Sequence, residues 1–122
     1  MLKFLLPLVF LSIPLFAQEG YATYYTVKSC QKEGTSGVFT ASGTRFVESD
    51  MTCAMRSRKW GTKWRVTNVS TGKSVVVTLT DFGPGRKATE RGVVIDLTPA
   101  AYSGIGGSKK AGRLKVRVDQ VE

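Results

Sequence analysis

Short runs in which apolar and polar side chains alternate are the feature that most constrains the fold of this chain. The clearest run lies near the C-terminus, where Leu114, Val116 and Val118 alternate with charged residues. Side chains of a β-strand point alternately to opposite faces, so this pattern predicts a strand with one buried and one solvated face. Residues 74–80 show the same alternation, and residues 70–73 before them carry a turn signal.

The rest of the chain supports a mainly β reading. Residues 20–27 are rich in aromatic residues and threonine, and residues 63–69 form another strand-like run. Five or six short strands leave few unpaired edges only if the sheet closes on itself. We therefore predict a small, closed, β-rich barrel.

One short helix is predicted before the last strand. Thr98 can cap it, Pro99 suits its first position, and residues 100–105 fill it. Glycines at positions 104, 106 and 107 end it.

The first seventeen residues have the outline of a secretory signal peptide. They contain one early positive charge at Lys3, an apolar run over residues 4–16, and a small residue, Ala17, before Gln18. The apolar run is too short to cross a bilayer as a stable helix, so we expect no membrane anchor after its removal. Residues 18–122 then form a single domain, secreted or periplasmic, with enough chain for one core.

Charge and composition restrict the chemistry. The formal net charge is +9, which favours an anionic partner: a cell-wall polymer, a membrane surface or nucleic acid. An exported protein seldom meets nucleic acid, so we expect no such partner. The chain has no histidine, which excludes Ser-His-Asp and Cys-His machinery and zinc sites built on imidazole. We expect no metal and no cofactor. Residues 72–74 (GKS) are similar to the end of a phosphate-binding loop, but the first glycine of that motif would have to be residue 67, which is Thr67.

The two cysteines, Cys30 and Cys53, predict a disulfide if the chain is exported. Closing a loop of about 22 residues would stabilise the fold by roughly 3 kcal/mol on the chain-entropy estimate. The alternative is two separate buried thiols.

Two carboxylates are candidates for chemistry. Asp81 continues the buried parity of residues 75, 77 and 79 and then meets a Gly-Pro-Gly turn beside Phe82. A partly desolvated carboxylate at such a strand end suits a general acid. It could instead bond the amides of its own turn. Asp96 directly precedes the predicted helix, where it could bond the helix amide ends.

Aromatic side chains could stack on sugar rings or simply fill the core. The candidates for substrate contact among them are Tyr25, Trp60 and Tyr102.

Taken together, these residues resemble the rare-lipoprotein-A-like (RlpA-like) double-psi β-barrels, which are related to the expansins. Order and spacing agree across nearly all of residues 18–122. The matching segments are residues 20–25 (GYATYY), 40–43 (TASG), 61–62 (GT) with 65–68 (RVTN), 72–77 (GKSVVV), 81–84 (DFGP) and 94–101 (VIDLTPAA).

The resemblance implies a six-stranded barrel crossed by a sugar-binding groove, with peptidoglycan as the polymer. In septal-ring members it also implies lytic transglycosylase activity. Asp81 matches the family's aspartate at this strand end, while Asp96 and Thr23 match groove-lining residues of expansin-type barrels. The family pattern has a histidine at the position of Met55 and a glutamate at the position of Thr44.

Two functions follow as hypotheses for a protein we expect to be monomeric. The first is a lytic transglycosylase that cleaves peptidoglycan glycan strands with Asp81 as general acid and base. The second is an expansin-like module that binds or loosens wall polysaccharide without cleaving it.

Overall fold

The computed structural model describes residues 17–32 and 39–121. The predicted signal peptide therefore lies, except for Ala17, outside the described residues. Within the described part of the chain, no helix has the length and apolar character needed to cross a membrane.

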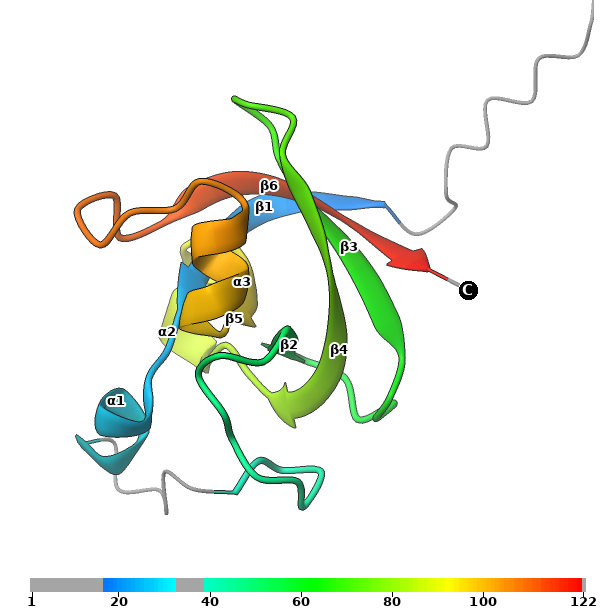
Figure 1. Ribbon diagram of the computed structural model, residues 1–122, viewed down its shortest axis with the longest axis vertical. Helices are drawn as coiled ribbons and strands as arrows, with labels where there is room; N and C mark the ends of the chain where they lie inside the picture. Colours follow the sequence, from blue (N-terminus) through cyan, green and yellow to red (C-terminus); the bar gives the residue numbers. More distant parts are fainter. Residues whose placement is uncertain (1–16, 33–38, 122) are drawn as a thin grey trace, which may run out of the picture.

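Six strands close into a barrel in the spatial order β1-β5-β2-β4-β3-β6, in which the last strand pairs with the first (Figure 1). The β1–β5 and β2–β4 pairs are parallel, and the other pairs are antiparallel. The prediction of a mainly β, six-stranded closed barrel is confirmed. The strands are β1 (Gln18–Tyr24), β2 (Thr52–Met55), β3 (Lys63–Asn68), β4 (Ser74–Phe82), β5 (Val93–Leu97) and β6 (Leu114–Val121).

The barrel core is filled by the inward-facing residues of these strands, as the alternation predicts. Val77 and Leu79 of β4 and Val116 and Val118 of β6 are all 0% exposed. The alternation fails at Asp119, which was expected on the solvated face but is only 9% exposed. Its carboxylate lies 3.4 Å from the guanidinium of Arg117, so the buried charge has a partner.

Three short helices, rather than the one predicted, connect the strands of the described chain. The predicted helix is α3 (Pro99–Gly104), where Thr98 Oγ1 accepts the Ala101 amide at 3.3 Å. The other two are α1 (Val27–Lys32) and α2 (Arg86–Glu90). Helix α1 lies in a polar segment for which the sequence analysis predicted no helix.

The predicted disulfide is not found, because Cys53 is a free thiol. Cys53 lies on β2 with 0% exposure, within the same core cluster as Leu79 and Leu97. The side chain of Cys30 lies outside the described part. Burial raises the pKa of the Cys53 thiol far above its usual range, and the Asp96 carboxylate adds to the effect. Cys53 is thus a small core residue, and its burial agrees with the alternative in which the two cysteines are separate buried thiols.

Candidate functional site

The strand register sets four residues in a row across adjacent strands. Thr23 of β1 pairs with Asp96 of β5, Asp96 pairs with Ala54 of β2, and Ala54 pairs with Asp81 of β4. Because neighbouring strands lie about 4.8 Å apart, the Cα atoms of the two aspartates are separated by roughly 10 Å. The small Ala54, 3% exposed, forms the floor between them.

Asp81 is fixed by contacts from three directions. Its Oδ1 accepts the amide N–H of Phe82 at 2.9 Å and that of Ala41 at 2.9 Å. Its Oδ2 receives the Tyr25 hydroxyl at 3.5 Å. One amide is that of Phe82, the last residue of β4, and the other belongs to a distant loop, so neither comes from the Gly-Pro-Gly turn named in the alternative. The carboxyl group therefore ties that loop to the strand end while remaining part of the groove surface.

Asp96 makes a hydrogen bond across the barrel strands. Its Oδ1 accepts the hydroxyl of Thr23. The helix after it has a different cap, since the Thr98 side chain accepts the α3 amide. The turn after Asp81 passes beside Asp96, because a Cβ at Gly83 would lie 3.6 Å from Asp96 Oδ2. The two aspartates thus belong to one site.

An open groove of about 1320 Å³ runs over this row of residues. Of the predicted site residues, Thr23, Tyr25, Asp81 and Asp96 line it. Phe39 and Phe46 line it too and escaped the sequence analysis. Tyr25 and Phe46 stack with ring centroids 4.6 Å apart, and Phe39 is 62% exposed. The exposed Phe39 ring gives the groove an apolar surface suited to a sugar ring, while Phe46 is largely buried beneath its contact with Tyr25.

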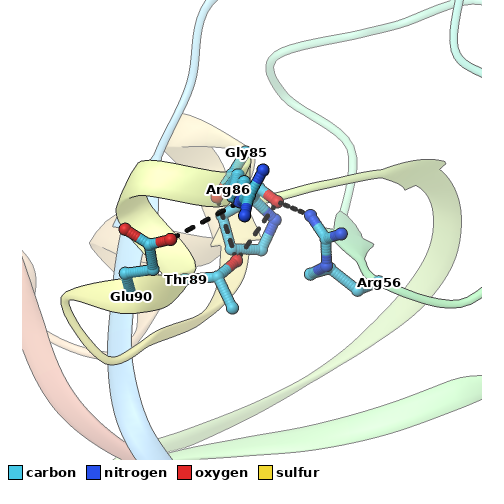
Figure 2. A network of polar contacts seen from close by, with 6 residues as sticks. Arg56, Gly85, Arg86, Thr89 and Glu90 are labelled. Atoms are coloured by element: carbon cyan, nitrogen blue, oxygen red, sulfur yellow. Dashed lines mark hydrogen bonds and ion pairs between the residues drawn. The ribbon is translucent and has the colours of Figure 1, made fainter.

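The segment between β4 and α2 is braced from both sides, as Figure 2 shows. The Arg56 guanidinium donates to the Pro84 carbonyl at 3.1 Å and lies 5.3 Å from the centroid of the Phe82 ring. The Thr89 hydroxyl donates to the Gly85 carbonyl at 2.9 Å. These contacts hold the turn that follows Asp81 and position α2 along the groove.

Two predicted groove residues lie elsewhere. Tyr102 is 3% exposed and packs in the core against Tyr24, with ring centroids 4.8 Å apart. Its burial, with a smaller effect from Tyr24, raises the pKa of its hydroxyl. Trp60 is half-buried against the core and is not among the groove-lining residues. The prediction for Tyr102 is corrected, because α3 turns its side chain inward, whereas substrate contact by Trp60, which precedes β3, stays a prediction.

Met55 and Thr44 are the two positions at which the sequence departs from the family pattern, and the structure shows what surrounds each of them. Met55 is 7% exposed and belongs to the core cluster. Thr44 joins the hydroxyls of Thr40 and Ser42 in a cluster with oxygen separations of 2.8 to 3.0 Å. This cluster flanks the Ala41 amide that binds Asp81. The loop that binds Asp81 through Ala41 therefore carries a cluster of hydroxyl groups.

No group of three or more histidine, cysteine or carboxylate side chains that could hold a metal ion occurs among residues 17–32 and 39–121. The chemistry available in the groove is that of two carboxyl groups, several hydroxyls and cationic side chains.

The closed six-stranded barrel of mixed parallel and antiparallel strands is the fold of double-psi β-barrel proteins, and solved structures agree. The Streptomyces papain inhibitor superposes with a TM-score of 0.63 at 21% identity, covering 90% of this chain and 98% of that one. The expansin of Clavibacter michiganensis superposes with a TM-score of 0.62 at 23% identity, covering 87% of this chain and 50% of that one. At these identities the likeness concerns the fold alone.

Sequence comparison narrows the class to a family. The family model described as "Lytic transglycolase" matches residues 17–118, and the chain belongs to this RlpA-like double-psi β-barrel family. A "Probable endolytic peptidoglycan transglycosylase RlpA" of Nostoc sp. is 42% identical over 88 residues, which is 72% of this chain and 22% of the relative. The "Endolytic peptidoglycan transglycosylase RlpA" of Rickettsia typhi is 33% identical over 104 residues, 85% of this chain and 30% of the relative. The chain thus spans less than a third of the length of these two relatives.

Proposed function

We propose that this protein is a lytic transglycosylase of peptidoglycan glycan strands, with Asp81 as the group that moves the proton. The observation that carries the proposal is the fixed position of the Asp81 carboxyl group in the groove. Two amides orient Oδ1, and Oδ2 lies beside the Tyr25 hydroxyl. An acid with a fixed orientation can meet a glycosidic oxygen repeatedly in the same geometry.

The reaction needs one such group in two steps. The protonated Asp81 donates its proton to the glycosidic oxygen, and the bond from that oxygen to C1 of muramic acid breaks. The resulting carboxylate then takes the proton of the C6 hydroxyl, whose oxygen bonds to C1 and closes an anhydro ring. No water enters, and Asp81 ends protonated as it began.

The neighbouring residues supply binding rather than proton transfer. Phe39 offers an exposed ring to the sugar, and the Thr23–Asp96 pair offers polar atoms to its hydroxyls. The proposal places the protein outside the cytoplasm, secreted or periplasmic, with residues 1–17 as its signal peptide. It acts there as a monomer on an insoluble polymer.

A second candidate function is an expansin-like module that binds wall glycan without cleaving it. The observation that favours it is the surroundings of Asp81, where Thr44 and Met55 replace the carboxylate and the imidazole of the family pattern. The groove and the Thr23–Asp96 pair serve both functions equally.

Digestion of purified glycan strands free of stem peptides separates the two. The lytic transglycosylase releases products with anhydro-muramic ends, detected by mass spectrometry, whereas the binding module leaves the strands intact. Retention on insoluble peptidoglycan, measured in parallel with part surviving about 0.5 M salt, is expected for both. Retention without anhydro products over prolonged digestion would exclude the enzyme and select the second function.

A further inference from the structure

Cationic side chains outnumber acidic ones along the groove. Its two carboxylates are Asp81 and Asp96, which lie in the central row of residues. Its cations come from the residue after β2, from α2 and the residue after it, and from the loop before β6; they are Arg56, Arg86, Lys87, Arg91 and Arg113. A neutral polymer would need no such excess of positive charge.

Helix α2 divides its charges between two faces. Arg86 and Glu90 are separated by four residues and form an ion pair at 3.5 Å, which Figure 2 shows. Lys87 and Arg91 are also four residues apart, so they share a neighbouring face. The acid of α2 is already paired with Arg86, and both Lys87 and Arg91 are exposed and line the groove.

The loop before β6 adds a third cation at this end. The Arg113 guanidinium donates to the carbonyl of Arg91 at 3.4 Å and lies 3.9 Å from the centroid of the Tyr21 ring. Stacking on a tyrosine ring fixes the plane of a guanidinium and leaves its remaining N–H groups at the edge. Arg113 is therefore a donor next to Arg91, and α1 lies at a distance from this loop (Figure 1).

We propose that Lys87, Arg91 and Arg113 form a carboxylate-binding subsite, which recognises the acid groups carried by the glycan strand. This inference rests on the proposed function and deepens it by naming the chemical group of the substrate that the groove binds. Guanidinium groups match the planar carboxylate with paired N–H donors. The source of the carboxylate is either the lactyl group of muramic acid or the stem peptide.

The arrangement of charges favours a polymer with both neutral and anionic parts. The middle of the groove holds the carboxyl groups of Asp81 and Asp96, which offer no positive charge to an anionic chain. A sugar face can pack on Phe39 at the aromatic part, and an acid substituent can reach the cations near α2. A strand of alternating neutral and acidic sugars has this composition.

Binding to chemically matched glycans tests the inference. The ligands are peptide-free glycan strands, the same strands with their carboxylates converted to neutral methylamides, and uncharged chitin oligomers of similar length. We expect amidation to weaken binding about tenfold, to the level of chitin, at a fixed salt concentration. Equal affinity for the peptide-free and amidated strands would overturn the inference and leave the proposed function intact. Absence of binding to all three would contradict the proposed function itself.

Strands that retain their stem peptides identify the source of the carboxylate. If they bind no better than peptide-free strands, the lactyl group is the recognised acid. If they bind better and peptide-free strands bind no better than chitin, the recognised acid belongs to the peptide. Both results support a carboxylate subsite.

Variants locate the subsite. Arg91→Gln and Arg113→Gln should each weaken binding of peptide-free strands about fivefold and remove much of the difference from amidated strands. Arg65→Gln is the matched control, because Arg65 is exposed on β3 outside the groove and loses the same charge. Melting temperatures verify that each variant is folded. An equal loss of binding in Arg65→Gln would show that overall charge, and not this subsite, attracts the polymer.

Discussion

Substitution of Asp81 by asparagine separates the catalytic from the structural role of this residue. An asparagine Oδ1 can accept the same two amides, from Ala41 and Phe82, that the carboxylate accepts at 2.9 Å. Its NH₂ group takes the place of Oδ2 beside the Tyr25 hydroxyl. The variant therefore keeps the shape of the site and loses the transferable proton.

The expected magnitudes follow from these contacts. Two hydrogen bonds change from a carboxyl to an amide oxygen as acceptor, which costs about 1 kcal/mol each at most. Asp81 is only half-buried, so we expect a total loss near 1 kcal/mol and a fall in melting temperature of about 4–8 °C. Loss of a positioned general acid lowers turnover by roughly 10²–10⁴-fold.

The assay measures anhydro-muropeptide release, retention on peptidoglycan and melting temperature for the wild type and three variants. Asp81→Asn should lose turnover and keep retention. Asp81→Ala removes the oxygen that accepts both amides, so it should lose turnover and more stability than Asp81→Asn. Asp96→Asn should affect stability or binding at least as much as turnover, because Asp96 bonds Thr23 in the groove. Near wild-type turnover in folded Asp81→Asn would refute the assignment of Asp81 as the acid.

Three further predictions test the fold and the groove. Thr98 is fully buried, caps α3 and donates to the Asp50 carbonyl at 2.6 Å. Thr98→Ala should therefore lower the melting temperature measured by calorimetry by roughly 10 °C. An unchanged melting temperature would contradict the role of Thr98 as the cap. In a Cys30→Ser background, the buried Cys53 thiol should resist a thiol reagent at pH 8 in the native protein, because burial keeps the thiol protonated. After unfolding it should react at once. Rapid reaction of Cys53 in the native protein would place this thiol at the surface. Phe39→Ala should weaken retention on peptidoglycan about fivefold at unchanged melting temperature, because the ring is 62% exposed, and unchanged retention would remove it from the binding surface.

The sequence predicted those elements of the fold that have a repeated pattern of apolar and polar residues or clear start and stop signals. Alternation predicted β4 and β6, and the Thr98-Pro99 start with its glycine end predicted α3. Helices α1 and α2 were missed because five or six residues are too short to show a helical period, and α2 has no side-chain cap. Strand β2, with four residues, is recognisable only from its pairing with β4 and β5.

The site was readable only in part. Parity along β4 placed Asp81 at a strand end, and the family resemblance pointed to Thr23 and Asp96. Their common row depends on which strands are neighbours, and a single sequence does not contain that information. Tyr102 failed as a groove residue because an aromatic side chain fits a core and a sugar surface equally well.

The cations of the groove escaped the sequence analysis for a related reason. Lys87 lies on a helix that was not predicted, Arg91 follows directly after that helix, and Arg113 reaches Arg91 from a loop far along the chain. The expected disulfide failed because cysteine count and export say nothing about the direction of a side chain. On β2, Cys53 points into the core.

Digestion of peptide-free glycan strands in ¹⁸O-labelled water tests the central claim most directly. A transglycosylase closes the anhydro ring with the substrate's own C6 oxygen, so the account predicts new anhydro ends that carry no label. Lysozyme, a hydrolase, serves as the control that incorporates the label at C1 of each new reducing end. Labelled reducing ends from this protein, or no new ends at all, would contradict the claim that its groove carries out lytic transglycosylation.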